Sequence, residues 1–509
     1  MEFDALKDLI QIITRNKVKN IEILGNPGPD ESRTEALYDG ISKGKWTSDD
    51  QAANFFFGSN EKDPNYKKLR NKLVRQLINT SLFIDVNQPM FNERSKALYN
   101  CYRDFAAANI LHLREANKAA VYLMEQILEQ SMKYEFTELV AEITRFLRMR
   151  SARSVGDRTK HEYYTELHQK YEEKRRLELK ALDYYETLIN YYIYKRSPND
   201  EVHKLASAYY DELSPLSTTI DTSQFYYHTF QIGIIKYMSI NDCKTALKIC
   251  ETALETLQRR KNTSRSGLSS IAGQKLACLT QLRIFGDEDG ERTAQFTLSL
   301  SEEGSYNWFR TLETYFQYNI YTKQYERAID VYKQATLHPR FNVLNPNVLD
   351  KWQLYGGYLH LLAALGKLTQ QNVEEVVGPF KFSKFTNEFE VFDKDKEGMN
   401  IPLTLLPMLF SIAKGEDFQD TYGRSLDALE KYRKRYLDID MNRRSASFLN
   451  ILMALGRLKF EQESAERKIK KEVAILERIP LQVGGQSFAV EVIPYEDLWE
   501  MLKTTLKIS

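Results

Sequence analysis

Small and bulky apolar residues recur at helical spacing in the stretch of the chain that is easiest to interpret. Tyr325, Ala328, Tyr332 and Ala335 follow one another at intervals of three, four and three residues, which places them on one face of a helix. The small side chains of Ala328 and Ala335 let a second helix approach closely, and the two tyrosines fill the space beside them. Pro339 ends this helix because proline lacks the backbone N–H that a helix needs.

A related face follows a little further along the chain. Trp352, Tyr355, Gly356 and Leu359 combine three bulky residues with one small residue on one side of a helix. Together the two half-patterns resemble the second and first helices of a tetratricopeptide repeat, a helix–turn–helix unit that stacks into a solenoid. The resemblance implies an array of helix pairs that binds other macromolecules.

The same pattern extends, less regularly, over residues 89–472. Its most complete helix pair has Ala246 at the small position of the second helix. However, Ala120, Ala246 and Ala328 are not separated by multiples of about 34 residues, the length of a tetratricopeptide repeat. We therefore predict an all-α protein with a divergent, tetratricopeptide-like α-solenoid. The chain as a whole also resembles a bacterial family whose role is not established.

One long element stands out within this region. Residues 157–196 contain neither glycine nor proline, and they predict either one helix of about 40 residues or two helices with an unmarked break. Charged residues dominate the first half, whose apolar set is limited to Tyr164, Leu167 and Tyr171. Three interpretations of this half remain open: a solenoid helix with a solvated face, a projecting arm, or a dimer contact.

Two departures from helix are expected near the C-terminus. Residues 378–402 carry closely spaced phenylalanines and predict an irregular loop that packs on the solenoid. In residues 473–509, the pair Gly484 and Gly485 separates two apolar runs, which predicts a β-hairpin. Pro494 then opens a last helix, which would cap the exposed end of the solenoid.

Residues 1–88 predict a small helical domain of different character. Ser48 and Gln51 form a capping box that starts a short helix, and Pro64 opens a longer helix over residues 64–79. The apolar residues of this second helix fall on one face. Its other positions carry five cations and no acidic residue: Lys67, Lys68, Arg70, Lys72 and Arg75.

A short helix, a turn and a basic amphipathic helix follow one another in helix-turn-helix DNA-binding proteins. The stretch from Thr47 to Phe83 resembles the winged-helix part of bacterial regulators that join such a domain to tetratricopeptide-like helices. Three interpretations of the basic helix remain open. It is a packing helix with a solvated basic face, a nucleic-acid-binding helix, or a helix that binds an acidic protein partner.

Composition limits the classes of protein to which the chain can belong. The chain has 71 basic and 70 acidic residues, so any attraction to nucleic acid or to membranes must be local. A hydrophobic content of 42% with 28% charged residues is typical of a soluble globular protein. Four cysteines are too few for a disulfide framework, and neither a signal peptide nor a membrane span is apparent. We therefore expect a cytoplasmic location and no membrane partner.

Motifs that would carry chemistry are incomplete. The stretch from Gly40 to Trp46 is one residue short of a phosphate-binding loop and has tryptophan where the hydroxyl belongs. The stretch from Asp393 to Gly398 opens like a calcium loop, but the closing glutamate is missing. Two pairs of residues spaced seven apart, His161 with His168 and Cys243 with Cys250, lack further metal ligands nearby in sequence. We expect no catalytic residue, cofactor or metal site.

These observations favour a non-enzymatic protein-interaction scaffold or adaptor that holds a partner protein or peptide in a helical-repeat groove. Candidate anchors in that groove are Tyr315, Tyr318, Tyr355 and Tyr358, because tyrosine offers a large contact area at modest entropic cost. The alternative is a bacterial regulator that binds nucleic acid through its N-terminal domain, with the solenoid as sensor or dimerisation module. A third class is an enzyme whose site is assembled only by folding.

Overall fold

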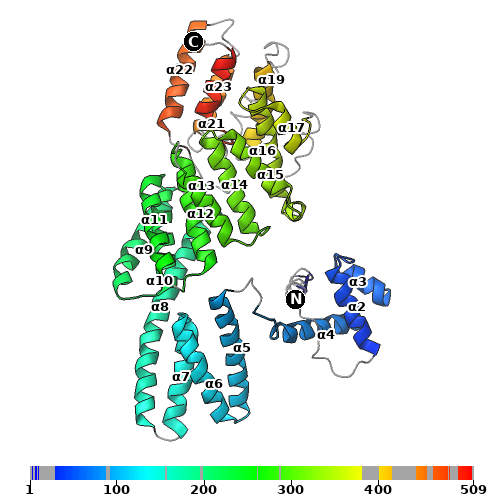
Figure 1. Cartoon of the computed structure of the whole chain (residues 1–509), viewed down its shortest axis with the longest axis vertical. Coiled ribbons are helices and arrows are strands. Elements are labelled where there is room, and N and C mark those ends of the chain that lie inside the picture. The colour runs from blue at the N-terminus through cyan, green and yellow to red at the C-terminus, as the bar shows by residue number, and fades with distance from the viewer. Residues whose placement is uncertain are drawn as a thin grey trace. The chain divides into compact units, whose positions relative to one another are not determined.

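The computed structural model shows that the protein is all-α, as the sequence predicts (Figure 1). It describes residues 3, 6, 7, 10, 29–87, 92–154, 157–194, 199–260, 262–285, 288–380, 400–414, 443–455, 462–479, 481 and 491–506. Within these ranges the chain forms α-helices and two short 3₁₀ helices, without any strand. None of these helices is long and apolar enough to cross a membrane. The chain divides into two compact units, residues 1–173 and 174–509. The finer boundaries expected at residues 88 and 472 stay predictions.

The first unit opens with α2 (Pro29–Ser42), α3 (Asp49–Phe57) and α4 (Pro64–Ser81). As predicted, Ser48 caps α3, because its side chain accepts a hydrogen bond from the backbone N–H of Gln51. The turn between α2 and α3 is filled by Trp46, whose ring lies so close to Gly40 that a Cβ atom there would be 2.0 Å from it. Gly40 therefore serves the packing of Trp46.

Four longer helices complete the first unit. They are α5 (Glu93–Leu113), α6 (Asn117–Lys133), α7 (Thr137–Ser154) and the beginning of α8 (Arg158–Tyr194). α8 is one continuous helix of 37 residues, and its first half packs on α6 and α7. Tyr164 and Leu167 are buried there, and the Tyr164 hydroxyl donates a hydrogen bond to Glu125 at 2.9 Å. The interpretation of this half as a projecting arm is therefore wrong, since a few apolar residues at helical spacing bury one face.

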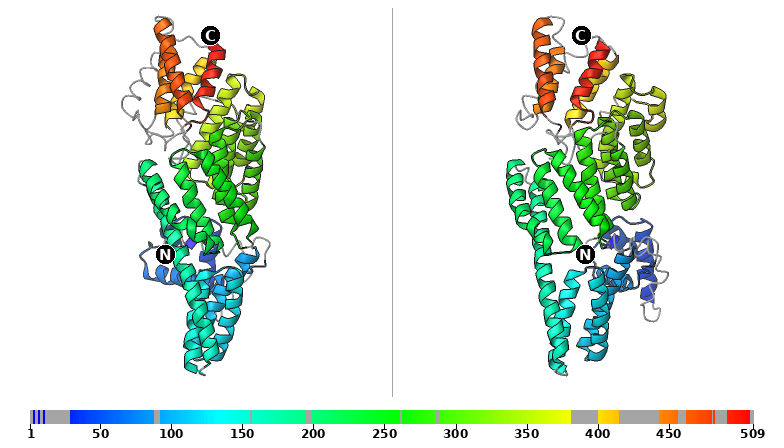
Figure 2. Two further views of the ribbon diagram at one scale, coloured as in Figure 1. Left: turned by 90° about the vertical axis from the view of Figure 1, so that its left-hand side faces the viewer. Right: turned by 60° about the vertical axis from the view of Figure 1, so that its left-hand side comes forward.

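The second unit begins in the later half of α8 and continues through a series of shorter helices. They are α9 (Asn199–Leu213), η1 (Ser214–Thr218), α10 (Ser223–Met238), α11 (Cys243–Arg259), α12 (Arg265–Leu282), α13 (Asp289–Leu300), α14 (Tyr306–Tyr321), α15 (Tyr325–Thr336), η2 (Phe341–Val343), α16 (Pro346–Ala364) and α17 (Gln370–Val377). Figure 2 shows α10 to α17, coloured from green to yellow, lying side by side.

Four helices of this series recur at nearly constant spacing. α10, α12, α14 and α16 begin at Ser223, Arg265, Tyr306 and Pro346, an interval of about 41 residues each time. Each is followed by a residue with a positive φ angle, and a partner helix comes after the turn. These turn residues are Asn241 (60°), Arg283 (50°), Lys323 (61°) and Gly366 (69°).

The left-handed turn residue closes the end of each first helix. In three of the turns the next N–H reaches back across the last turn of the helix. Asp242 N–H donates to the Tyr237 carbonyl, Gln324 N–H to the Asn319 carbonyl and Lys367 N–H to the Leu362 carbonyl, at 3.0, 2.8 and 2.9 Å. The separation of Ala246 from Ala328 equals two intervals of this array. This interval is longer than the roughly 34 residues of a tetratricopeptide repeat, so multiples of that length do not reveal it.

Small residues bring neighbouring helices together, as the sequence pattern predicts. Ala328 and Ala335 are completely buried on α15. On α16, a Cβ atom added to Gly356 would lie 2.7 Å from the Tyr332 hydroxyl and 2.8 Å from Cγ1 of Val377. Gly356 thus allows α15 and α17 to pack closely on α16.

The four tyrosines expected to line a groove lie in the core instead. Tyr315, Tyr318, Tyr355 and Tyr358 are each at most 4% exposed. The ring of Tyr355 stacks on Phe316 with centroids 4.7 Å apart, and the Tyr358 hydroxyl donates to the Pro402 carbonyl at 2.9 Å. The prediction that they anchor a partner is wrong, because both faces of their helices are covered.

The last described helices of the unit are α19 (Asn400–Lys414), α21 (Arg443–Leu455), α22 (Gln462–Arg478) and α23 (Tyr495–Leu506). The helix predicted after Pro494 is confirmed as α23, in which Leu498, Trp499 and Leu502 are buried. The glycine pair of the expected β-hairpin lies outside the described residues, as does most of the expected loop over residues 378–402.

The approach of α15 to α16 generates a stability prediction. Gly356→Ala should lower the melting temperature of the full-length protein, because overpacking a core costs about 1–3 kcal/mol. Gly273→Ala is the matched control: this glycine also lies inside a helix, and a Cβ atom there would meet nothing within 4 Å. It should leave the melting temperature unchanged or raise it. Equal effects of the two substitutions would contradict the close approach at Gly356.

Candidate functional site

The basic helix singled out in the sequence is α4. Its start is fixed by Asp63, whose carboxylate accepts hydrogen bonds from the backbone N–H groups of Asn65 and Tyr66 at 2.8 and 3.0 Å. Pro64 occupies the first turn, where proline is favourable. α3 ends at Gly58 in the left-handed conformation, and residues 58–63 form the turn that joins the two helices.

One face of α4 forms the core of this part of the chain. Tyr66, Leu69, Leu73 and Leu77 are buried together with residues of α2 and α3. Their spacing of three and four residues accounts for the burial, and all four were predicted from the sequence. Because this face is buried in the core, the opposite side of α4 faces away from it.

Arg70 differs from the other four cations of the predicted site. Its Nε lies 2.7 Å from an Oδ atom of Asp49, and both side chains are mostly buried, at 12% and 15% exposed. The same oxygen accepts a hydrogen bond from the Tyr66 hydroxyl at 2.6 Å. Burial and this carboxylate raise the pKa of Tyr66, so the phenol stays protonated as a donor. Arg70 therefore joins α3 to α4.

The remaining four cations face away from the core. Lys67, Lys68 and Arg75 are exposed and Lys72 is half-buried. None of these four side chains makes a hydrogen bond or ion pair with the residues that the structure describes. Asn71 and Asn79 are exposed on the same side. The structure thus gathers four of the five predicted residues on one open face.

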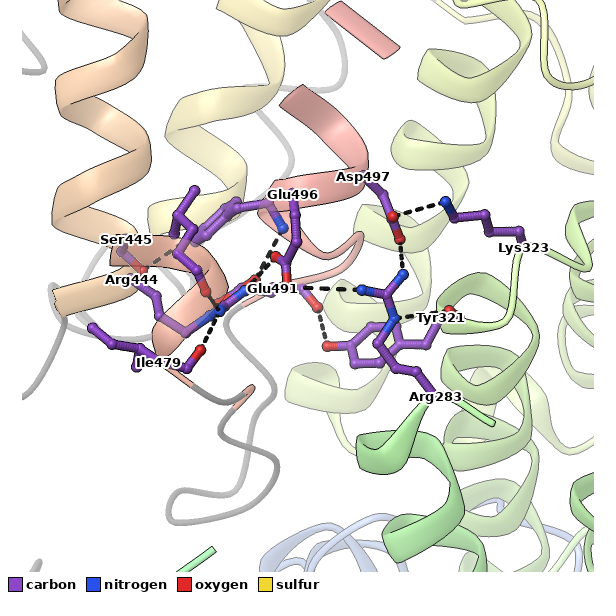
Figure 3. A network of polar contacts seen from close by, with 11 residues as sticks. Arg283, Tyr321, Lys323, Arg444, Ser445, Ile479, Glu491, Glu496 and Asp497 are labelled. Carbon is purple, nitrogen blue, oxygen red and sulfur yellow. Dashed lines mark hydrogen bonds and ion pairs between the residues drawn. The ribbon is translucent and has the colours of Figure 1, made fainter. Parts of the chain in front are cut away.

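A second cluster of charged residues lies in the other unit, and sequence reasoning did not find it (Figure 3). Arg444 of α21 holds both carboxylate oxygens of Glu491, at 2.6 and 3.0 Å. The other arm of its guanidinium donates to the carbonyls of Leu476 and Ile479 at 2.8 and 2.5 Å. Although burial alone would lower the pKa of Arg444, Glu491 and Glu496 raise it, so the guanidinium stays charged.

The same cluster ties α23 to the turns of the helix pairs. Asp497 forms an ion pair with Arg283 and another with Lys323, the latter at 3.0 Å. Arg283 also donates to the Tyr321 carbonyl, and the Tyr321 hydroxyl donates to the Glu491 carbonyl at 2.6 Å. These charged and polar groups are ion-paired or hydrogen-bonded to one another, so the cluster has a structural role and connects the helices.

A third buried pair joins α14 to α16. Lys351 Nζ lies 2.7 Å from Oε1 of Glu313, and the two side chains are 2% and 9% exposed. Burial lowers the pKa of Lys351, and Glu313 opposes that shift. One helical turn further on, Gln317 donates to the Tyr355 hydroxyl at 3.0 Å. The pair is enclosed within the helix array.

The histidines and cysteines noted in the sequence have structural surroundings. His161 and His168 lie 3.1 Å from the carbonyl oxygens of Arg148 and Ala141 on α7, so they connect helices. The pair Cys243 and Cys250 is joined by Cys278, and all are buried as free thiols. Among the described residues, no group of histidine, cysteine or acidic side chains could hold a metal ion. The calcium-loop-like stretch from Asp393 lies outside these residues.

The distinction between Arg70 and its neighbours on α4 can be tested by substitution. Arg70→Gln should destabilise α3 and α4 by about 2 kcal/mol, because Asp49 would keep a largely buried charge without its partner. Hydrogen exchange of the full-length protein should show faster exchange in both helices. Lys67→Gln removes the same charge from the exposed face and should leave the exchange unchanged. Equal exchange in the two variants would show that Arg70 is not a structural residue.

Comparisons of the chain with protein-family models, with curated protein sequences and with solved structures found no match.

Proposed function

We propose that the protein is a non-enzymatic scaffold or adaptor, built from tetratricopeptide-like helix pairs, that binds a partner protein. The observation that carries this proposal is the nearly constant spacing of α10, α12, α14 and α16 along the chain. In a helical-repeat array each pair packs on its neighbours and leaves the edges of the array free for binding. The interval is longer than a tetratricopeptide repeat, which has about 34 residues, so the likeness is one of architecture.

The contacts of the buried charged groups support a non-enzymatic role. Arg444 is bonded to Glu491, and Lys351 is bonded to Glu313. A catalytic acid or base needs a group that can reach its substrate. Among the described residues, these buried charges instead hold helices together.

The surface proposed for the partner is one edge of the array, defined here as the edge patch: Tyr306, Leu337 and Val343. These side chains are 60%, 66% and 80% exposed. They belong to the start of α14 and to the loop between α15 and α16.

Contacts within the array bring these two segments together. The ring of His338 lies 5.1 Å from Trp308 and 5.5 Å from Phe309, and Arg340 pairs with Glu302 at 3.6 Å. Large apolar side chains that gather on a surface mark interaction sites, whereas isolated ones need no explanation. The edge patch is therefore the first surface to test.

The test is to recover the tagged full-length protein from its native cells, with and without nuclease treatment, and to quantify what co-purifies. The proposal predicts protein partners that survive nuclease. It also predicts that the triple variant Tyr306→Ser, Leu337→Ser and Val343→Ser loses them at least tenfold, since apolar anchors dominate binding energy.

A matched control uses another set of exposed apolar residues, Tyr102→Ser, Ile110→Ser and Leu113→Ser on α5, which are 50%, 60% and 81% exposed. This variant should retain the partners. The absence of any stoichiometric protein partner would contradict the scaffold proposal. Equal loss of the partners in both variants would show that the edge patch is not the binding surface.

A further inference from the structure

A feature that the scaffold proposal does not use is the open face of α4, defined by Lys67, Lys68, Lys72 and Arg75. We infer that this face binds double-stranded DNA. It lies in the first unit and does not depend on the helix array, so the two proposals can fail separately.

The face of α4 carries positive charge that no described acidic residue compensates. No acidic residue occurs between Pro64 and Ser81, and these four cations make no ion pair with the described residues. Lys68 and Lys72 are four residues apart, and Lys72 and Arg75 are three apart, so like charges are neighbours on the helix surface. Such neighbours repel one another and cost a few tenths of a kcal/mol each. A polyanion such as DNA removes this cost when it binds.

Other exposed cations of the same unit show the contrast. Lys43 pairs with Asp39, Arg145 with Glu142, and Arg158 with Glu162, at distances of 2.7 to 2.9 Å. Single exposed cations whose side chains have no described partner also occur in this unit, at Lys62, Lys118 and Arg153. The face of α4 differs because four such cations share one side of one helix.

The packing of α4 and its order after α3 also favour DNA binding. α4 is fixed from behind by Tyr66, Leu69, Leu73 and Leu77, and Arg70 ties it to α3. α3, the turn and α4 follow one another in the order of a helix-turn-helix motif, whose second helix enters the major groove. With 18 residues, α4 is about 27 Å long, and the major groove is about 12 Å wide. The exposed face of α4 can thus lie along the groove.

The other side chains on the face of α4 favour DNA over an acidic protein as the partner. Asn71 lies among the cations, and its amide carries both a donor and an acceptor for base edges. A protein interface would place apolar anchors at its centre. The exposed apolar residue Ile78 lies C-terminal to the four cations, and the exposed Leu82 follows the end of α4.

The salt dependence of binding gives a quantitative expectation. Four cations that neutralise phosphates predict a slope of about −3.6 for the logarithm of the association constant against the logarithm of salt concentration. Affinity should therefore fall roughly 150-fold between about 50 and 200 mM salt. Each single substitution, such as Lys68→Gln, should reduce the slope by about 1.

The experiment measures fluorescence anisotropy of a labelled, random-sequence duplex of about 20 base pairs with the full-length protein over this salt range. The quadruple variant Lys67→Gln, Lys68→Gln, Lys72→Gln and Arg75→Gln should lose binding at least tenfold at the lowest salt and show a slope near zero. Because these side chains are outside the core, its melting temperature should match that of the unsubstituted protein.

The charge-matched control is the quadruple variant Arg467→Gln, Lys468→Gln, Lys470→Gln and Lys471→Gln on α22, where all four cations are exposed. It should keep both affinity and slope. Absence of binding at the lowest salt, binding that the quadruple variant retains, or equal loss in the control would overturn the inference. An acidic protein that binds through α4 and is not displaced by the duplex would also overturn it.

Discussion

The burial of α14 from Thr311 onward, and of α16 from Lys351 onward, is the constraint on which the second unit depends. Every residue of α14 from Thr311 to Tyr321 is buried or half-buried, and a helix without a solvated face needs neighbours on both sides. The two helices are joined by Lys351 with Glu313 and by Tyr355 with Gln317, and both contacts link residues 38 positions apart. A shift of one helix by a turn would leave a buried charge without a partner, so this contact also fixes the register of the array.

Ion pairs tie the C-terminal helices to one another and to turns of the helix array. Glu491 is held by Arg444, while Asp497 of α23 is held by Arg283 and Lys323, two of the left-handed turn residues. Arg283 and Asp497 are 214 positions apart, so their contact makes α23 a structural part of the array. The turn residues thus have two roles: they end the first helix of each pair, and two of them receive α23.

Local patterns predicted what depends on neighbouring residues. The helix class, the small positions Ala328 and Gly356, the buried face of α4 and the helix after Pro494 all follow from periodicity and helix-start chemistry. Features that depend on residues distant in sequence could not be predicted from these local patterns. The side on which Tyr355 lies is decided by two neighbouring helices, and the pairing of Arg70 by an aspartate 21 positions away. The regular spacing of the helix pairs stayed hidden because the small residues that reveal it recur only in alternate pairs, at Ala246 and Ala328. On α4, the sequence identified the cations but not which of them face outward.

The central claim is that Asp497 ties α23 to the turns of the helix array. Its most direct test is hydrogen exchange of the full-length protein carrying Asp497→Asn, compared with Glu500→Gln, an exposed acidic residue on the same helix. The account predicts faster exchange in α23 and α14 with Asp497→Asn, unchanged exchange in α5 to α7, and no effect of Glu500→Gln. Unchanged exchange in α14, or equal changes with both substitutions, would contradict it.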